Sequence, residues 1–526
     1  MAGLGRVKEI SGLGFRIRGL IRAANGLSVS SQSHSQYSSQ SSSALEMETE
    51  AEQRMKRTQV LECKGERQAN DIKIADGKKK SSEILESEAA MMDQVKRVRG
   101  VEAEANFAKA EESAMAKHIK SLIQFRGGPI TVAEYMEEVL TNPIAGFYMN
   151  RDVFGAAGEF VTSPDISQMF GEMVGVWCMC LWHQMGQPNH VHLVELGPGR
   201  GTLMADLLRG TAKFTDFSQT LSVHMVECSP ALKSIQQETL KCCPKDQADS
   251  TSAVDSQKCK PTEDQISQIS GAVISWHLDL EHVPRGVPTI IIAHEFYDAL
   301  PIHQFQRTPR GWCEKLVDVA EGSGPGFRFV LSPGPTTASS LYLAKRMKWA
   351  SLEEKAKIEH VEVCPSALKL TAEIARRVGE DGGGALVVDY GEDVMVSDSL
   401  QAIRKHEFVK VLQDPGSADL SAYVDFAAIK HAVEDEAAGS SAFGPVCQSQ
   451  FLGALGINFR LEALLQNATE EQAEALQLGY WRLVGDGPPP WLDKDDDPKS
   501  APTGMGSRYK ALAIVSDACG VPIGFQ

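Results

Sequence analysis

The chain has 526 residues, a formal net charge of −16 and 42% hydrophobic residues. This length leaves room for more than one domain, and the composition is that of a globular protein rather than a disordered or fibrous one. No arginine-rich stripe interrupts the acidic body, which excludes nucleic acid as the main partner because phosphate neutralisation supplies most of such binding. The eleven cysteines form no CxxC pair and no zinc-ligand spacing, so we predict free thiols and no metal site. No apolar run approaches the ~20 residues that a transmembrane helix needs.

Residues 1–45 have the composition of an organelle transit peptide. Basic and apolar residues alternate up to Arg22, Glu9 is the only acid before Glu46, and serine and glutamine dominate residues 28–43. An amphipathic start that is rich in arginine and serine and poor in acids is typical of such leaders. On composition alone, both the mitochondrion and the chloroplast remain open as the destination.

Residues 46–120 are rich in Glu, Lys, Gln, Ser and Ala and poor in aromatic residues. Such a segment cannot bury enough apolar surface to fold alone, so we expect a disordered or partly helical linker. A coiled-coil contact is the alternative, although no sustained heptad repeat supports it.

Residues 121–190 are expected to form an N-terminal helical segment and a glycine-rich loop over the site. The apolar spacing of residues 130–140 predicts a helix, with Thr131 and Glu134 in a capping box at its start. A second, strongly apolar helix is predicted over residues 169–185. This helix suits either the core of the domain or the interface of a homodimer.

The strongest local signal is a glycine turn between a strand and a helix. The β-rich run Val191–Leu196 leads into a turn with three glycines, and a helical pattern follows. This order makes the first unit of a nucleotide-binding sheet, in which glycines let the backbone approach the ligand. Dinucleotide enzymes prefer GxGxxG, which points a helix N-terminus at a pyrophosphate. The pattern here is ExGxGxG, which suits a ligand without phosphate such as S-adenosylmethionine (SAM). The residues expected to bind this cofactor at the turn are Glu195, Gly197, Pro198, Gly199, Gly201 and Thr202.

The following strands place more polar groups at the same edge of the sheet. An alternating strand over 221–226 ends at Glu227, where a carboxylate can accept hydrogen bonds from two ribose hydroxyls. A polar stretch over residues 245–268 is interpreted as a surface insertion, after which the sheet resumes. Asp279 or His277 then falls where a group contacting adenine is expected, and Asp279 is our candidate.

A continuous apolar run, Thr289–Ala293, predicts a central strand that is buried on both faces. Because ligands bind at the carboxyl ends of parallel strands, the acids that follow it, Glu295 and Asp298, are our catalytic candidates. Glu159 and Asp389 are held in reserve, and Glu159 is also a cofactor-binding candidate. Glu159 follows a glycine-rich loop, Gly146–Gly158, which is able to gate the site. His294 and Glu295 do not begin a zinc HExxH motif, because no histidine stands at position 298.

These elements together predict an α/β fold. We expect a Rossmann-like SAM-dependent methyltransferase sheet with helices on both faces and an inserted α+β substrate-facing subdomain. Residues 191–301 are assigned to the SAM-binding core. A hairpin pattern with a third strand follows, so residues 302–381 are assigned to the insertion. Residues 382–526 form the remainder of the methyltransferase domain and a C-terminal segment.

In their order along the chain, these segments resemble the MidA family, the mitochondrial complex I assembly-factor methyltransferases. The resemblance is dispersed over almost the whole span from Gly127 to Lys510. Glu159 stands where the family usually has Asp, and Tyr297 where Phe is common, which leaves the details of the substrate open. The segments that carry the resemblance are Gly128–Ile130, Gly158–Thr162, Val194–Met204, Glu295–Pro301, Asp389–Gly391, Pro415–Gly416, Asp419–Leu420, Val424–Phe426 and Met505–Gly506.

The resemblance implies a SAM-dependent protein arginine methyltransferase in the mitochondrial matrix. Its partner would be a protein substrate, a matrix-arm core subunit of complex I, with symmetric dimethylation of an arginine during assembly. A guanidinium has a pKa above ~12, so carboxylates are needed to hold it and to receive a proton.

Several alternatives stay open at this stage. One is a SAM-binding complex I assembly chaperone with little or no turnover. A nicotinamide oxidoreductase is disfavoured by the missing GxGxxG, whereas lysine or a small molecule remains open as the methyl acceptor. The apolar helix over 169–185 also leaves a homodimer open.

Overall fold

The computed structural model describes residues 112–149, 152, 162–244, 264–321, 326–491 and 504–526. The predicted leader and nearly all of the predicted linker lie outside these residues, as do Glu159 and most of the Gly146–Gly158 loop. The chain divides into two units, and every described element belongs to the second, Ala105–Gln526. Within the described part, no helix has the length and apolarity to cross a bilayer.

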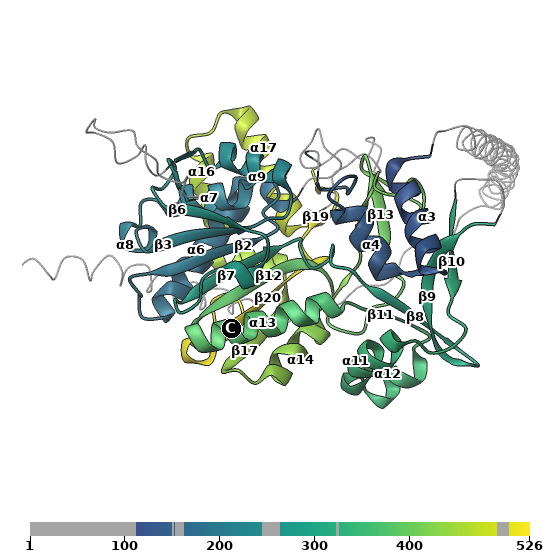
Figure 1. The fold of residues 1–526 in the computed structure, drawn as a ribbon. Coiled ribbons are helices and arrows are strands. Elements are labelled where there is room, and N and C mark those ends of the chain that lie inside the picture. The colour runs from purple at the N-terminus through teal and green to yellow at the C-terminus, as the bar shows by residue number, and fades with distance from the viewer. Residues whose placement is uncertain (1–111, 150–151, 153–161, 245–263, 322–325, 492–503) are drawn as a thin grey trace, which may run out of the picture. The chain divides into compact units, whose positions relative to one another are not determined.

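A mixed sheet of ten strands forms the centre of the second unit (Figure 1). Strands β12, β7, β2, β3 and β6 are parallel neighbours, while β20 and β17 extend one edge and β5 and β4 the other, all antiparallel. β16 pairs with the end of β12. The bounds in spatial order are β17 (Ser440–Cys447), β20 (Tyr509–Ser516), β12 (Gly383–Glu392), β7 (Thr289–His294), β2 (Val191–Leu196), β3 (Leu221–Val226), β6 (Val273–His277), β5 (Gln265–Ser267) and β4 (Cys242–Pro244), with β16 at Val424–Asp425.

Helices cover both faces of this sheet, which confirms the predicted fold class. All six residues of β7 are buried, as expected for a strand that is packed on both sides. Alternate side chains of β7 belong to different hydrophobic clusters: Ile290 and Ile292 face α6 and α7, while Ile291 and Ala293 face α13 and α14. The helices of the first face are α6 (Gln168–Gln184), α7 (Thr202–Thr211), α15 (Gln448–Leu455), α16 (Ile457–Leu465) and α17 (Glu470–Val484), and those of the second are α13 (Pro365–Asp381) and α14 (Phe426–Glu436).

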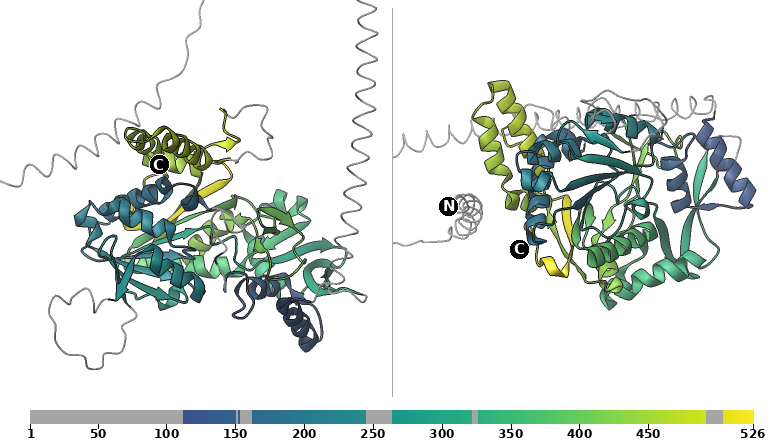
Figure 2. Two further views of the ribbon diagram at one scale, coloured as in Figure 1. Left: turned by 90° about the horizontal axis from the view of Figure 1, so that it is seen from above. Right: turned by 60° about the vertical axis from the view of Figure 1, so that its left-hand side comes forward.

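The apolar helix predicted over 169–185 is α6, and it belongs to the core. Its buried residues include Phe170, Trp177 and Leu181, and α7, α15 and α16 pack against it. Figure 2 shows the C-terminal helices in yellow-green beside this layer. Of the two alternatives that the sequence left for this helix, the structure therefore supports the core.

A second, antiparallel sheet of five strands stands beside the first. Its order is β1-β9-β8-β11, with β10 paired to β9. The hairpin predicted after residue 301 is β8 and β9, and the predicted third strand is β10. α3 and α4 pack on this sheet through a shared apolar cluster. The elements are α3 (Ala114–Arg126), β1 (Ile130–Thr131), α4 (Val132–Thr141), β8 (His303–Thr308), β9 (Gly311–Val319), β10 (Phe327–Leu331), a π-helix (Ser339–Leu343), α11 (Ala344–Trp349), α12 (Leu352–Lys357) and β11 (His360–Val363).

The remaining elements are short. A three-stranded sheet has the order β14-β13-β15, and β18 pairs with β19. Their bounds, with those of the short helices, are β13 (Gln401–Arg404), β14 (Glu407–Val409), β15 (Asp419–Ser421), β18 (Asp486–Gly487), β19 (Gly504–Met505), α5 (Ser163–Ile166), α8 (Thr215–Ser218), α9 (Pro230–Thr239) and the 3₁₀ turns η1 (Leu280–His282) and η3 (Asp517–Cys519).

Three expectations about the elements are corrected. The helix expected from residue 130 begins at Val132, because Thr131 caps it in the predicted capping box and Ile130 pairs with β9. The polar stretch over 245–268 ends in β5, which lies between β6 and β4 in the main sheet, and its residues 245–263 lie outside the described part. Helix α13, assigned to the insertion, packs on the main sheet with α14 instead, because its inward residues Ile374 and Val378 belong to the same cluster as Ile291. The division into domains itself stays a prediction.

Candidate functional site

A cavity of about 770 Å³ opens at the carboxyl ends of the parallel strands β2, β3, β7 and β12. The glycine turn after β2 and the turn after β7 line it on one side, and α4 and the β13–β14 hairpin line it on the other. Eight acidic residues line the cavity against two arginines and two histidines. The acids are Glu134, Glu137, Asp165, Glu195, Glu227, Glu295, Asp298 and Asp419. This excess of carboxylates suits a cationic ligand.

The glycine turn has a backbone that side chains would disrupt. Gly197 has a φ of +59°, and a Cβ there would lie 2.5 Å from Cδ2 of Phe296. Gly201, with a φ of +79°, is the N-cap of α7. These two positions therefore need glycine, one for the close approach of a ring and both for the left-handed conformation.

Glu195 lies directly before this turn and is only 3% exposed. Burial raises the pKa of its carboxyl to about 8. Its Oε2 has no hydrogen-bond partner among the described residues, although the side chain lines the cavity. A buried acceptor without a donor is costly, so Glu195 fits a ligand that brings a donor, such as the ammonium group of SAM.

Glu227, at the end of β3, is held by two donors. The backbone N–H of Ser229 donates to Oε1 over 2.7 Å, and Nε2 of Gln236 donates to Oε2 over 3.0 Å. Burial raises the pKa of this carboxyl to about 7. Each oxygen keeps a lone pair for a further donor. The arrangement fits the two hydroxyls of a ribose.

Gln236 was missed by the sequence analysis. It is fully buried on α9, and its Nε2 also donates to the carbonyl of Gly199 over 2.8 Å. Its Oε1 accepts from the indole N–H of Trp276. Gln236 thus ties the glycine turn to Glu227. One signal was available, since position 236 lies one turn after the apolar Leu232 and so on the inward face of the helix.

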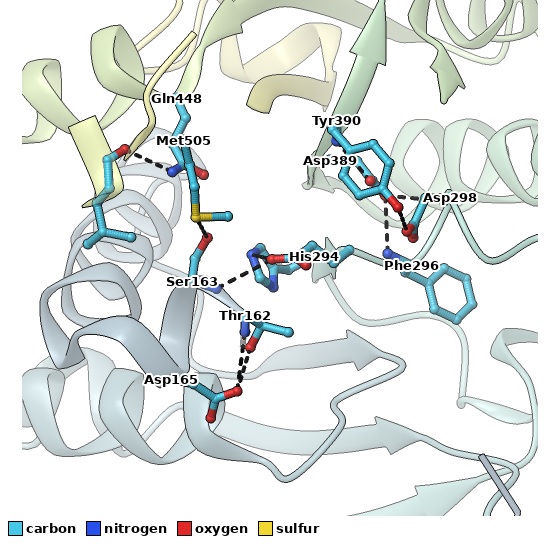
Figure 3. Close-up of polar contacts among 12 residues, drawn as sticks. Thr162, Ser163, Asp165, His294, Phe296, Asp298, Asp389, Tyr390, Gln448 and Met505 are labelled. Atoms are coloured by element: carbon cyan, nitrogen blue, oxygen red, sulfur yellow. Dashed lines mark hydrogen bonds and ion pairs between the residues drawn. The ribbon is translucent and has the colours of Figure 1, made fainter. Parts of the chain in front are cut away.

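The turn after β7 places Glu295 at the cavity with a φ of +47°. Its Oε1 accepts from the backbone N–H of Ser163 over 3.3 Å and lies 3.2 Å from Nε2 of His294. Figure 3 shows Ser163 and His294 at this point. The side chain of Glu295 is 13% exposed, so it is mostly buried but still reaches the cavity.

Asp389 organises that turn from the end of β12. Its Oδ2 accepts from the backbone N–H groups of Phe296, Tyr297 and Asp298 over 3.1, 3.0 and 3.3 Å, and its Oδ1 accepts from the N–H of Tyr390 over 2.9 Å. Asp389 is fully buried and does not line the cavity. Of the candidate acids, Asp389 therefore acts on the shape of the turn.

Asp298 lies beside Glu295 in the same turn. The hydroxyl of Tyr390 donates to its Oδ2 over 2.5 Å (Figure 3). Burial, with the nearby carboxylates, raises the pKa of Asp298 to about 7. Its Oδ1 has no hydrogen-bond partner within the described ranges, although the residue is only 8% exposed and lines the cavity. This oxygen is available to a donor from a ligand.

The structure places Asp279 outside the lining of the cavity. Its Oδ1 accepts from the backbone N–H of His282 over 3.0 Å and so caps η1, and the side chain is 52% exposed. The alternative residue, His277, pairs with His224 over 3.0 Å. Neither residue lines the cavity, whereas Leu278 between them does. Glu159 lies outside the described residues.

Sequence comparisons identify the protein's relatives. Residues 173–446, just over half of the chain, match a family model described as "Putative S-adenosyl-L-methionine-dependent methyltransferase". The chain belongs to this family. It is therefore a methyltransferase with SAM as its cofactor, and the resemblance seen in the sequence is confirmed.

Curated relatives cover most of the chain. "Protein arginine methyltransferase NDUFAF7, mitochondrial" of Xenopus tropicalis is 38% identical over 77% of this chain and 88% of its own length. The Mus musculus protein of the same name is 41% identical over 70% of this chain and 80% of its own. The corresponding homologue of Drosophila melanogaster is 41% identical over 77% and 86%. Their names support a mitochondrial location for this methyltransferase, in agreement with its leader-like first 45 residues.

Solved structures agree on the fold. A superfamily member from Burkholderia thailandensis, bound to S-adenosyl-homocysteine (SAH), is 21% identical, with a TM-score of 0.58 over 78% of this chain and 94% of the other. A second structure from the same organism and superfamily has a TM-score of 0.57 at 21% identity. At this identity the likeness shows the fold of the methyltransferase alone.

Proposed function

We propose that this methyltransferase transfers the methyl group of SAM to an arginine of a protein. The observation that carries the proposal is the pair Glu295 and Asp298, two adjacent carboxylates at the end of β7 that line an acidic cavity with the glycine turn. The names of the curated relatives support arginine as the acceptor. We further propose a matrix-arm subunit of complex I as the substrate, symmetric dimethylation as the product and the mitochondrial matrix as the location.

The cofactor end of the cavity is assigned to the residues around β2 and β3. Glu195 and Glu227 would hold the ammonium and the ribose hydroxyls of SAM, while the glycine turn lets the backbone approach it. The turn residues are Gly197, Pro198, Gly199, Gly201 and Thr202, of which Gly201 acts as the cap of α7 and not as a lining residue. Glu159 stays a prediction for the same ligand.

When bound, SAM would supply a methyl group on a sulfonium; a bond from the nucleophile to this methyl forms in line as the C–S bond breaks, and the sulfur leaves as the neutral thioether SAH. A protonated guanidinium is a poor nucleophile, so the protein must orient one nitrogen and take up a proton as the new bond forms. The Glu295 carboxylate holds and orients the guanidinium through charge-assisted hydrogen bonds. The Asp298 carboxyl, whose pKa lies near 7, is suited to receive the proton at its Oδ1.

The test is transfer of a radiolabelled methyl group from SAM to purified matrix-arm subunits by the full chain. Label on arginine with the wild type and none with Glu295→Gln would support the reaction and the assigned carboxylate. Glu353→Gln, an exposed change on α12, serves as the control and should transfer normally. Labelled lysine in place of arginine would contradict the proposal.

The competing function is a SAM-binding complex I assembly chaperone with little or no turnover. Two results together would establish it. The wild type would bind SAH in calorimetry without transferring a methyl group, and the Glu295→Gln variant would still support assembly of complex I. A homodimer stays a prediction, and light scattering of the purified chain tests it.

A further inference from the structure

Asp419 is an acidic residue of the cavity that the sequence did not single out as functional. It begins β15, lines the cavity and is only 8% exposed. The hydroxyl of Tyr148 donates to its Oδ1 over 2.6 Å. The backbone N–H of Ala422, which directly follows β15, donates to the carbonyl of Asp298 over 2.9 Å. Asp419 is therefore attached to the turn that carries the proposed catalytic carboxylates.

Glu295, Asp298 and Asp419 act on one another electrostatically. The pKa of Asp419 is raised to about 6, mainly by burial; the Glu295 carboxylate adds to this rise and the hydrogen bond from Tyr148 opposes it. The carboxylates of Asp419 and Glu295 likewise raise the pKa of Asp298. All three residues line the cavity, and the hydrogen bond from Ala422 to Asp298 joins β15 to their turn, so carboxyl groups from two separate parts of the fold meet in this cavity.

This group of acids has few basic partners within the described part of the chain. Among the described residues, no lysine or arginine forms an ion pair with any of the three, and His294 is the only histidine that does so. The buried Oδ1 of Asp298 has no donor either. Tyr148, Tyr390 and Tyr509 also line this region, and the guanidinium of Arg508 lies over the ring of Tyr390, 5.3 Å from its centroid. Uncompensated buried carboxylates favour a cation that enters from outside.

We propose that Asp419 is a third carboxylate of the substrate site, and that it binds the guanidinium together with Glu295 and Asp298. This inference rests on the proposed function and assigns a residue to it. A guanidinium has five N–H donors in a plane, whereas an ammonium has three. A third carboxylate on another side of the ligand can bind the donors that Glu295 and Asp298 do not reach. The site therefore discriminates in favour of arginine over lysine.

Tyr148 is the positioning residue for Asp419. Its carbonyl also accepts from the hydroxyl of Ser229 over 2.7 Å, and the N–H of Ser229 donates to Glu227. Tyr148 is thus fixed at the backbone by the cofactor end of the cavity and reaches Asp419 with its hydroxyl. Tyr148→Phe removes that hydroxyl and its hydrogen bond to Asp419 while it keeps the aromatic ring.

The test uses ethylguanidinium as a probe and needs no turnover. Calorimetry with the full chain saturated with SAH measures probe binding to the wild type, Asp419→Asn and a control, Asp414→Asn, which lies in the loop before β15 and outside the cavity. We expect Asp419→Asn to weaken probe binding about 10- to 100-fold. The affinity of Asp419→Asn for SAH should stay unchanged, and the control Asp414→Asn should bind the probe as the wild type does. Equal binding of the probe by the wild type and Asp419→Asn would overturn the assignment, as would wild-type binding of Mg²⁺ in preference to the probe.

Tyr148→Phe gives a second readout that a purely structural role would not move. Without the Tyr148 donor the pKa of Asp419 rises further, so probe binding should need a higher pH than in the wild type. Glu295 and Asp298 are present in both the wild type and Tyr148→Phe, so they affect the pH profile of probe binding equally in the two proteins. Identical pH profiles would refute the positioning role. A wild type that binds the probe but methylates no arginine would instead remove the proposed reaction and leave the cation site in place.

Discussion

Replacing Glu227 by glutamine is expected to weaken cofactor binding and to stabilise the free protein. Burial raises the pKa of this carboxyl from 4.5 to about 7. When folding raises the pKa of an acid, the protein loses stability as the pH rises from the pKa of the unfolded state through the pKa of the folded state. At pH 8 the ionised Glu227 therefore destabilises the free protein. Glutamine removes that cost, but its amide NH₂ group replaces one of the two accepting oxygens. The net increase in the free energy of unfolding is therefore about 1 kcal/mol.

The affinity for the cofactor should change in the opposite direction. Each oxygen of Glu227 has one protein donor, which leaves one acceptor position per oxygen for a ribose hydroxyl. Hydrogen bonds to a charged acceptor contribute ~1.5–3 kcal/mol, against ~0.5–1.5 kcal/mol for neutral pairs. Two such changes together cost about 2–3 kcal/mol, which corresponds to about 30- to 150-fold in Kd.

The assay is calorimetric titration of SAH into the full chain at pH 8, with thermal unfolding of the free protein measured alongside. Glu238→Gln, an exposed change on the same helix α9, is the matched control and should alter neither quantity. The reasoning is refuted if Glu227→Gln binds SAH within a factor of ~2 of the wild type. A lower melting temperature of the free variant would refute it too, because the affinity loss would then reflect damage to the fold.

Three further perturbations test how the site is built. Asp389→Asn should lower the free energy of unfolding by about 2–4 kcal/mol in urea, because a neutral amide cannot accept from all four N–H groups; unchanged stability would show that the turn holds itself. Gly197→Ala forces a Cβ against Phe296 at positive φ, at a backbone cost of ~1–2 kcal/mol, and should weaken SAH binding in calorimetry, whereas normal affinity would contradict the role of the turn. Burial lowers the pKa of His224 to about 3 from 6.5, so the unfolded chain takes up a proton that the folded chain refuses, and stability should fall as the pH drops below 6.5. His224→Leu should flatten that pH dependence in urea titrations, and an unaltered profile would exclude this histidine as its source.

The local parts of the site were predictable from the sequence. The strand, turn and helix from Val191 to Thr211 have the predicted order, and Glu227 lies at the predicted strand end. Such elements are specified by neighbouring residues: β-branched runs form strands, and glycine provides positive φ. The capping box of Thr131 was predictable for the same reason.

The contacts between distant residues were not predictable. The Asp389 carboxylate binds N–H groups more than ninety residues earlier, so its role depends on β12 lying beside β7. Asp419 reaches the cavity only because β15 folds beside the turn after β7. Asp279 forms a local cap of η1 that the strand pattern did not predict, and its contact with the ligand stays a prediction. The order of residues along the chain does not show whether such a side chain will contact a neighbour in the sequence or a group from a distant part of the fold.

The strand β20 has a consequence for how faults in the gene would act. It lies between β12 and β17, and its residues 511–516 are all buried. A premature stop codon before Tyr509 would leave β12 with an open, apolar edge in the middle of the sheet. Unpaired edges of this kind recruit other chains. Such a truncation would therefore yield a protein prone to aggregation rather than a slightly shortened enzyme.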